Sequence, residues 1–243
     1  MIAQTAIGQG DRIGMDKATG PSVTQARANP LRRLAAGITG TAIRTFARLI
    51  TAVQAEWRGI EPYGGQRIYF ANHNSNGDFI LIWSVLSDQQ RRRTRPVAAA
   101  DYWGGRGIKG FVGRDVFNAV LIQRDRENRD TDPIAQMAGA LDQGQSLILF
   151  PEGTRNLTDD ILLPFKTGLY HLATQRPDID MVPVWIENLN RVMPKGEIIP
   201  VPIMCKTIFG APLRLEPGES RDDFLARSRD ALLALRPNPA EAG

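Results

Sequence analysis

The first strong pattern along the chain is a series of apolar residues at steps of three and four. The positions are Leu31, Leu34, Ile38, Ala42, Phe46, Leu49, Val53 and Trp57. This spacing places side chains on one face of an α-helix, so it predicts an amphipathic helix over residues 30–58. Four arginines fall on the opposite side at about 100° per residue: Arg33, Arg44, Arg48 and Arg58. Two interpretations stay open. The apolar face either packs on its own domain or lies in the interface of an anionic membrane.

After residue 58 the pattern alternates between short apolar runs and segments with helical spacing. Strands are predicted at 66–71, 95–100, 116–123, 146–150, 181–186 and 206–209. Helices are predicted at 78–86, 133–141, 168–175 and 221–235. This alternation predicts an α/β fold: one domain, residues 59–237, with a mostly parallel central sheet flanked by helices and preceded by the amphipathic helix. Residues 1–29 and 238–243 show no sustained period, and we expect flexible tails there.

The composition excludes several classes of protein. Apolar residues make up 42% of the chain, which is normal for a globular core and excludes global disorder. The single cysteine, Cys205, rules out an intrachain disulfide and fits a reducing compartment. No stretch reaches 18 apolar residues, so no spanning helix is predicted, and the N-terminus lacks the apolar centre of a signal peptide.

Positive charge is concentrated at the front of the chain. Residues 1–60 carry eight basic and three acidic side chains, whereas the remaining residues sum to a charge of −1. A basic front end indicates an anionic partner, either a membrane or a nucleic acid. We expect no nucleic acid, because interleaved aromatics and a recognised binding module are missing. A further basic cluster is predicted to be a solvated loop, or else a docking point for an acidic carrier protein or the membrane: Arg91, Arg92, Arg93 and Arg95.

A histidine stands at the exit of the first predicted strand of the domain, in HNSNGD. His73 can act as a general base near neutral pH, and Asp78 is the nearest carboxylate that could fix its tautomer. Five residues along one helix would place the pair about 140° apart, so their pairing requires the intervening turn. Ser75 or Asn76 is expected to cap the following helix, with Asp78 in its first turn. The plain alternative is that Asp78 only complements the helix dipole.

A second strand runs into LILFPEGTRN, which presents an arginine after a glycine turn. Arg155 could hold a phosphate with two hydrogen bonds, and Glu152 is expected to orient it or to bind a substrate hydroxyl. A third strand ends in Arg124. Ligands of open α/β sheets bind at the carboxyl ends of the strands. These exits therefore predict a site for a phosphorylated substrate.

Two of these motifs resemble the glycerolipid acyltransferases. HNSNGD resembles their H-x4-D signature, and FPEGTR matches a second block almost letter for letter. LIQR is similar to the block between them, and VPVWI, residues 182–186, to the fourth. The resemblance covers about residues 55–210. It implies the branch that moves a fatty acyl group from acyl-CoA or acyl-carrier protein to 1-acylglycerol-3-phosphate, forming phosphatidate.

The resemblance also implies a role for each matching residue. His73 becomes the general base and Asp78 its partner. The acceptor would be bound by Arg124, Glu152, Gly153, Thr154 and Arg155. No cofactor beyond the acyl donor and no metal is implied, and the enzyme would sit peripherally on the cytoplasmic face of the membrane. We expect backbone N–H groups of residues 74–78 to stabilise the oxyanion.

Three further features of the sequence bear on the function. Gln123 stands where the family usually has an acidic residue, so another lysolipid acceptor is an alternative. A separate alternative is a membrane-bound lipid-binding protein without turnover, against which the His73–Asp78 pair argues, because a binding module needs no base. GGRGIKG contains a G-x-G-x-x-G pattern, but Tyr102 and Trp103 separate it from the preceding strand, which argues against dinucleotide binding. The second histidine, His171, is expected to pack inside a helix.

Overall fold

The structure is a computed structural model and describes residues 29–62, 64–123, 125, 131–187 and 204–237. The predicted tails at 1–28 and 238–243, and the candidate site residue Arg124, lie outside the described residues.

The centre of the fold is a seven-stranded sheet with the strand order β1-β7-β6-β2-β5-β3-β4. The strands are β1 (Gln54–Trp57), β2 (Arg67–Ala71), β3 (Thr94–Ala99), β4 (Val120–Ile122), β5 (Ser146–Leu149), β6 (Asp180–Glu187) and β7 (Lys206–Phe209). All neighbours pair in parallel except β6 and β7, which are antiparallel. The predicted α/β class with a mostly parallel sheet is therefore confirmed.

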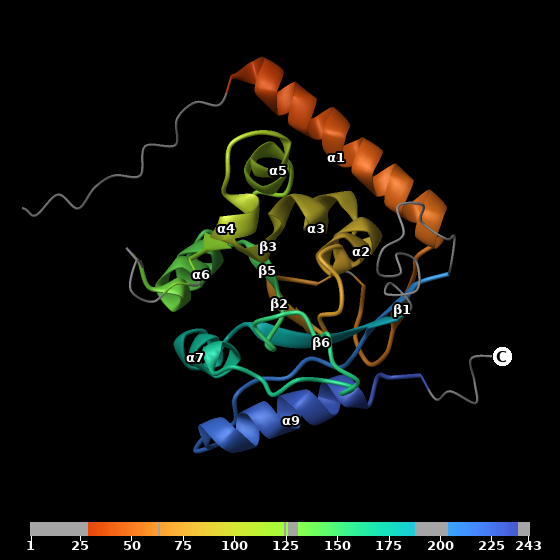
Figure 1. The fold of residues 1–243 in the computed structure, drawn as a ribbon. Helices are drawn as coiled ribbons and strands as arrows, with labels where there is room; N and C mark the ends of the chain where they lie inside the picture. The colour runs from red at the N-terminus through yellow and green to blue at the C-terminus, as the bar shows by residue number, and fades with distance from the viewer. Residues whose placement is uncertain (1–28, 63, 124, 126–130, 188–203, 238–243) are drawn as a thin grey trace, which may run out of the picture.

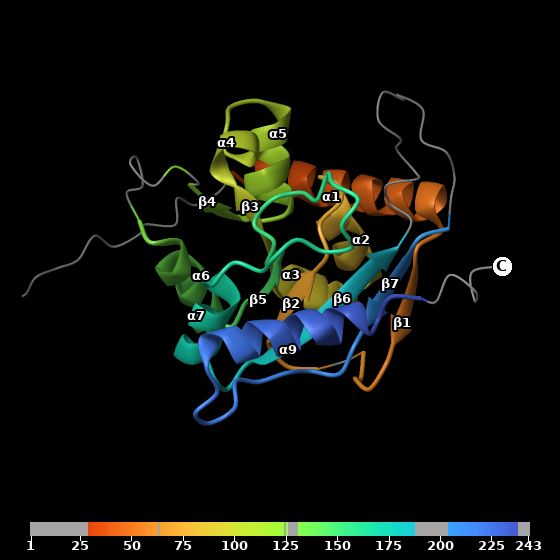
Figure 2. The same cartoon turned by 60° about the horizontal axis from the view of Figure 1, so that its bottom comes forward.

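Helices cover both faces of this sheet (Figures 1 and 2). One side carries α1 (Pro30–Thr51), α2 (Asp78–Val85), α4 (Ala100–Trp103) and α5 (Ile108–Phe111). The other side carries α6 (Pro133–Asp142), α7 (Gly168–Gln175) and α9 (Arg221–Leu233). Helix α3 (Asp88–Arg93) leads from α2 into β3, and a π-helical turn at Val112–Val116 precedes β4.

The sheet is apolar on both faces because both are covered. In β2 every residue is buried: Ile68 and Phe70 belong to the cluster under α6, α7 and α9, whereas Tyr69 and Ala71 belong to the cluster under α1 and α2. Strands of parallel sheets typically show such continuous apolar runs. This is why the central strands were found from sequence within one or two residues.

The amphipathic helix is shorter than predicted. Helix α1 ends at Thr51, Ala52 has a left-handed backbone with φ of 40°, and β1 follows in parallel with β7. Trp57 stacks on Phe209 with ring centroids 4.0 Å apart. The prediction of a helix through residue 58 is wrong over its last residues. A step of four residues keeps the same face of a strand as well as of a helix, so the apolar spacing concealed the change.

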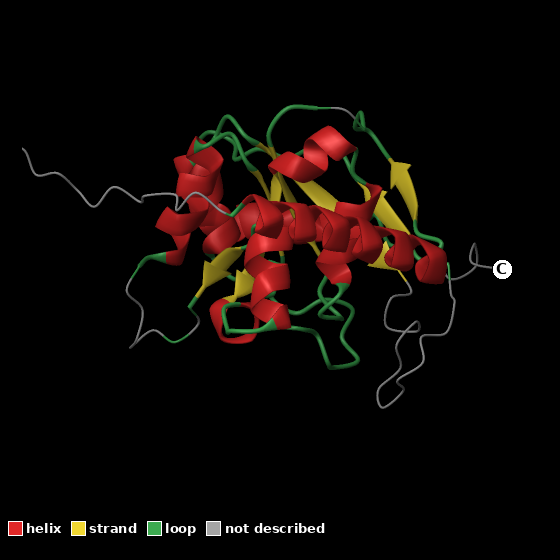
Figure 3. Ribbon diagram, turned by 90° about the horizontal axis from the view of Figure 1, so that it is seen from above, coloured by secondary structure: helices red, strands yellow, loops and turns green. Residues whose placement is uncertain are grey.

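The apolar face of α1 points away from the domain. Leu31, Leu34, Ile38, Phe46 and Leu49 are each more than 60% exposed, and we call them the apolar stripe. Figure 3 looks down on this side of the molecule, with α1 lying across it. The inward face carries the small residues Ala36 and Gly40, which are buried, and also Ile43 and Ile50, which are half-buried against the cluster under α1 and α2. A Cβ added to Gly40 would lie 3.2 Å from Val116 Cγ1, so the glycine permits close packing.

Two shorter segments also differ from their prediction. The strand expected at 116–123 is reduced to β4: the π-helical turn ends at Val116, and residues 117–119 are irregular, with Asn118 at a φ of 48°. The basic cluster is not a loop: Arg91, Arg92 and Arg93 form the last turn of α3, and Arg95 lies in β3. A capping box between Ser87 and Gln90 starts α3. Such reciprocal bonds satisfy backbone N–H groups at a helix start. The Ser87-x-x-Gln90 spacing therefore indicates a helix start, which the interpretation of the arginines as a loop overlooked.

Candidate active site

The two motif segments follow neighbouring strands. Strands β2 and β5 pair in parallel, with Phe70 opposite Leu149, so His73 and the Phe150–Arg155 segment leave the same edge of the sheet. The predicted convergence of these two strand exits is confirmed. The third exit, after β4, lies at the outer edge of the sheet, with β3 between β4 and β5. Arg124 itself lies outside the described residues.

His73 and Asp78 form a hydrogen-bonded pair. His73 Nδ1 lies 2.9 Å from Asp78 Oδ2, and the turn between them brings the two side chains together as their pairing required. The Asp78 side chain is 1% exposed, while the His73 side chain is 15% exposed. A carboxylate can only accept, so this contact places the imidazole proton on Nδ1. His73 Nε2 is then left with a lone pair that can accept a proton.

Asp78 Oδ2 also organises the turn itself. It accepts hydrogen bonds from Asn74 N at 2.7 Å and from Ser75 N at 2.8 Å. Asp78 is the first residue of α2, where the helix dipole favours a negative charge. Asp78 therefore both complements the dipole of α2 and bonds His73, so the two interpretations of this residue do not exclude each other. The helix start differs from the prediction: Gly77 is the N-cap, and no side chain caps the helix.

The expected oxyanion donors are already engaged. Besides the N–H groups of Asn74 and Ser75, Gly77 N donates to Ser75 Oγ at 3.2 Å, and Asp78 N donates to Ser75 O at 3.2 Å. Four of the five amides at residues 74–78 thus bond within the turn. The prediction that this segment supplies the oxyanion hole is wrong for those four.

Phe150 and Glu152 hold His73 from the neighbouring strand exit. The Phe150 ring stacks on the imidazole with centroids 4.1 Å apart and planes 16° apart. Glu152 Oε1 accepts from His73 N at 2.8 Å, and Glu152 Oε2 accepts from Leu163 N at 2.8 Å. Asn156 N donates to His73 O at 2.6 Å. Sequence reasoning missed Phe150, because a ring at a strand end carries no distinctive spacing.

Glu152 is buried, at 1% exposure. Burial raises the pKa of its carboxyl group, and the backbone N–H groups of Leu163 and His73 counteract part of that shift. Within the described residues Glu152 makes no ion pair with Arg155. Its geometry therefore favours a positioning role, in place of the expected contact with Arg155 or a substrate hydroxyl.

The glycine turn presents exposed polar side chains. Gly153 has a φ of 72°, and a Cβ there would lie 3.0 Å from Lys166 Cγ. Thr154 and Arg155 follow it and are exposed. Lys166, whose N–H donates to Pro151 O at 2.7 Å, adds a cation that the sequence did not single out. Two positive side chains thus flank the turn that follows β5, an arrangement suited to an anionic group.

Other candidate chemistry looks weaker in the structure. Helix α4 intervenes between β3 and the glycines of the G-x-G-x-x-G pattern, so the strand does not turn directly into a helix there. His171 is exposed on α7, so its predicted packing is wrong. Among the described residues, no cluster of three or more His, Cys, Asp or Glu side chains is arranged to hold a metal ion. In the same part of the chain no helix is long and apolar enough to span a membrane.

Comparisons with known proteins agree with the motifs. The chain is 43% identical over 161 residues to a 1-acyl-sn-glycerol-3-phosphate acyltransferase of Limnanthes alba, covering 63% of this chain and 53% of that protein. It is 30% identical over 158 residues to the mouse 1-acyl-sn-glycerol-3-phosphate acyltransferase alpha, covering 62% and 51%. The chain thus matches about half the length of these curated relatives.

A solved structure shares the fold. The crystal structure of the 1-acyl-sn-glycerophosphate (LPA) acyltransferase PlsC from Thermotoga maritima superposes with a TM-score of 0.62. The match has 21% sequence identity and covers 84% of this chain and 81% of that one. The model of the family described as Acyltransferase matches residues 48–187, which include both motifs and all strands from β2 to β6. The chain therefore belongs to the acyltransferase family.

Proposed function

We propose that the protein transfers a fatty acyl group from acyl-CoA or acyl-carrier protein to the free hydroxyl of 1-acylglycerol-3-phosphate, forming phosphatidate. The observation that carries this proposal is the contact between His73 Nδ1 and the buried Asp78 carboxylate. It leaves a partly exposed imidazole with one nitrogen free to accept a proton. The names of the relatives supply the acceptor and the type of group transferred.

In the proposed reaction, His73 Nε2 takes the proton of the acceptor hydroxyl as its oxygen attacks the thioester carbon. Asp78 stabilises the imidazolium that forms. When the tetrahedral intermediate collapses, the C–S bond breaks and His73 returns the proton to the leaving thiolate. Acyl transfer balances with the free thiol of CoA or carrier protein as the second product, and His73 is regenerated in its starting form.

We assign the acceptor's phosphate to the turn that follows β5. Arg155 and Thr154 are exposed there, Gly153 permits the turn, and Lys166 adds a second cation. Arg124 is proposed as a further phosphate ligand from the family resemblance. Glu152 is proposed as a positioning residue, because its two carboxylate oxygens bond the backbone N–H groups of His73 and Leu163.

We also propose that α1 rests on an anionic membrane surface. The acceptor and product are amphiphiles, and the apolar stripe of α1 is exposed. A helix with an apolar face and arginines on its opposite side suits the interface between lipid headgroups and acyl chains.

The acceptor identity has one specific alternative. Gln123 is exposed at the end of β4, where the family resemblance leads one to expect a carboxylate. We therefore propose to test acyl-CoA and acyl-carrier protein against a panel of lysolipids and to identify products by mass. Transfer to 1-acylglycerol-3-phosphate as the preferred acceptor supports the proposal. Preference for another lysolipid would replace the acceptor, and binding without any product would favour a lipid-binding protein.

His73→Ala should lower turnover by about 10²–10⁴-fold, because the general base is lost. The matched control is His171→Ala, which removes the other histidine from an exposed position on α7. Steady-state rates of both variants on the preferred acceptor check this expectation. Near wild-type turnover of His73→Ala would rule out the proposed mechanism.

Arg155→Ala should weaken binding of the acceptor about 10- to 150-fold and leave the KM for the donor nearly unchanged. A lost charged hydrogen bond costs about 1.5–3 kcal/mol. Arg155→Lys should recover only part of the loss, because an ammonium group cannot bind phosphate through two parallel bonds. The control is Arg236→Ala, an exposed arginine just beyond α9. Equal effects on donor and acceptor would argue that Arg155 does not hold the phosphate.

Glu152→Gln should lower kcat more than it raises either KM. An amide has one acceptor oxygen, so one of the two backbone N–H groups would face its NH2 group, at a cost of about 1–3 kcal/mol. The base would then be held less precisely while the exposed binding side chains remain. Urea unfolding and steady-state kinetics should be measured together, with the exposed Glu61→Gln as control. A loss confined to acceptor KM would instead indicate that Glu152 binds the acceptor.

Leu34→Ser combined with Phe46→Ser should reduce vesicle binding by at least tenfold, because each apolar side chain gains about 1.5–3 kcal/mol on full burial. Both residues are exposed, so the melting temperature should change little. The control pair Leu34→Met and Phe46→Leu keeps the apolar surface and should keep binding. Co-sedimentation with anionic vesicles measures the effect. Unchanged binding of the serine pair would contradict the role of the apolar stripe.

A further inference from the structure

A groove of about 460 Å³ lies between α1, α3 and the residues before β4. It is separate from the candidate active site: Thr94 and Asn118 line it at the beginnings of β3 and β4, whereas His73 follows the end of β2. Nothing in the proposed reaction uses this groove. We call it the α1–α3 groove.

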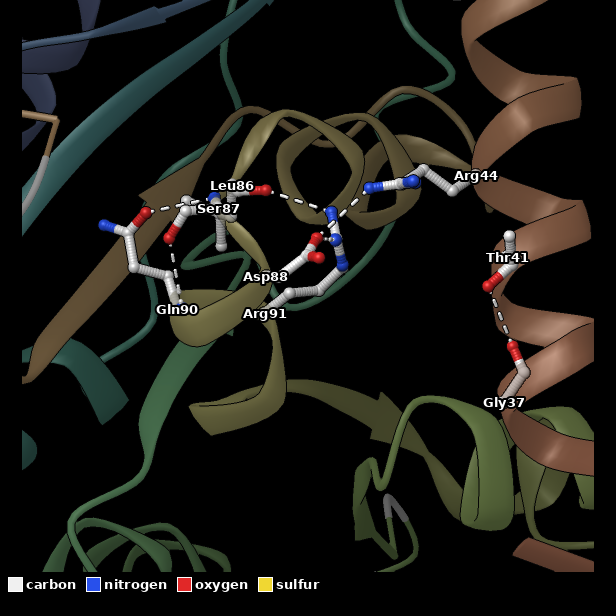
Figure 4. A network of polar contacts seen from close by, with 8 residues as sticks. All are labelled: Gly37, Thr41, Arg44, Leu86, Ser87, Asp88, Gln90 and Arg91. Atoms are coloured by element: carbon white, nitrogen blue, oxygen red, sulfur yellow. Dashed lines mark hydrogen bonds and ion pairs between the residues drawn. The ribbon is translucent and has the colours of Figure 1, made fainter. Parts of the chain in front are cut away.

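The lining of the α1–α3 groove is positively charged. It includes four arginines and two aspartates: Arg33, Arg44, Arg91, Arg92, Asp88 and Asp115. Asp88 is shared, since Arg44 Nη1 lies 3.2 Å from its Oδ1 and Arg91 also contacts that oxygen. Figure 4 shows the two guanidinium groups reaching Asp88 from α1 and α3. One carboxylate therefore serves two cations, which leaves an excess of positive charge.

Arg91 is fixed in place by its surroundings. Its Nη1 donates to Leu86 O at 3.0 Å, and its guanidinium lies 5.1 Å from the centre of the Trp83 ring, which also lines the groove. Burial, and then the charge of Arg44, lower the pKa of Arg91. A fixed cation beside like charges favours an anionic ligand.

Arg33 and Arg92 complete the lining from opposite sides, one on α1 and one on α3. Both are exposed, and neither makes an ion pair or side-chain hydrogen bond within the described residues. Arginine is suited to bidentate contact with phosphate oxygens. Two available guanidinium groups, one from each helix, thus line the same groove and can contact an anionic ligand in it.

The apolar stripe indicates where that phosphoryl group comes from. At 100° per residue, Arg33, Gly37 and Arg44 fall along one flank of α1, on the side turned away from the outward stripe. A helix whose stripe enters the acyl region holds its opposite side above the acyl chains, where long arginine side chains can reach headgroup phosphates. A soluble anion or a nucleic acid would not account for five exposed large apolar side chains on the same helix.

We propose that the α1–α3 groove binds the phosphate of an anionic phospholipid headgroup at a site distinct from the catalytic one. The bound lipid would join α1 to α3 through Arg33 and Arg92 and orient the domain on the bilayer. This inference rests on the membrane-binding part of the proposed function and not on acyl transfer.

The test compares Arg33→Gln/Arg92→Gln with the control pair Arg221→Gln/Arg236→Gln in the full chain. The control removes the same charge at either end of α9, on the opposite side of the molecule from α1 (Figure 1). Binding to phosphatidylcholine vesicles with one-fifth phosphatidate is measured by co-sedimentation. The groove pair should lose about 30-fold in affinity, since each arginine near an anionic surface is worth about fivefold, and the control pair less than about threefold.

A titration with inorganic phosphate, at ionic strength matched with chloride, separates lipid from free anion. The proposal expects wild-type protein to prefer phosphatidate vesicles and inorganic phosphate to displace them only weakly. Equal losses in both variant pairs would reduce the effect to net charge and overturn the site. Vesicle binding at the wild-type level by Arg33→Gln/Arg92→Gln would also overturn the proposed site. Tight binding of inorganic phosphate by a wild type that ignores vesicles would overturn the lipid assignment. The panel assay on detergent-dispersed acceptor reports the reaction separately.

Discussion

The geometry of the candidate site depends on the buried carboxylate of Glu152. Strands β2 and β5 are neighbours, but their ladder ends at Phe70 and Leu149, before the motif residues begin. Glu152 continues the connection by accepting from His73 N, and Asn156 N returns a bond to His73 O. The main chain of the histidine is therefore fixed on both its N–H and its C=O. Its side chain can then meet Asp78 and Phe150 at set distances.

Burying two carboxylates close to one imidazole costs free energy unless each has hydrogen-bond donors of its own. Removing a carboxylate from water carries a large penalty unless hydrogen bonds replace the lost solvent. Here Asp78 Oδ2 accepts two backbone N–H groups in addition to the ring, while its buried Oδ1 has no hydrogen-bond partner among the described residues; Glu152 accepts two backbone N–H groups, one on each oxygen. Burial raises the pKa of Glu152, and the nearby negative charge of Asp78 adds to that rise. The backbone thus stabilises both charges, and only Asp78 contacts the imidazole nitrogen.

The sequence predicted the parts of this arrangement that repeat or alternate. Apolar runs buried on both faces located β2, β5 and β6, and the H-x4-D spacing with its turn brought His73 to Asp78. Contacts that depend on neighbouring strands were not visible. Stacking of Phe150 on His73 and burial of Glu152 require the pairing of β2 with β5, which no local pattern encodes. The extent of α1 was misjudged because its apolar step also fits the strand that follows.

Helix α1 shows how packing can reverse the usual reading of amphipathicity. A surface helix normally buries its large apolar residues and exposes its small or polar ones. Here Ile43 and Ile50 pack inward, but at the closest contact Ala36 and Gly40 face the domain, and Gly40 lets Val116 and Trp83 approach closely. Turning the large residues inward would place Leu or Phe side chains where even a Cβ would crowd Val116 at 3.2 Å. The close contact therefore fixes which face of α1 points outward. As a result the apolar stripe faces solvent or lipid, and Arg33 and Arg44 line the groove beside α3.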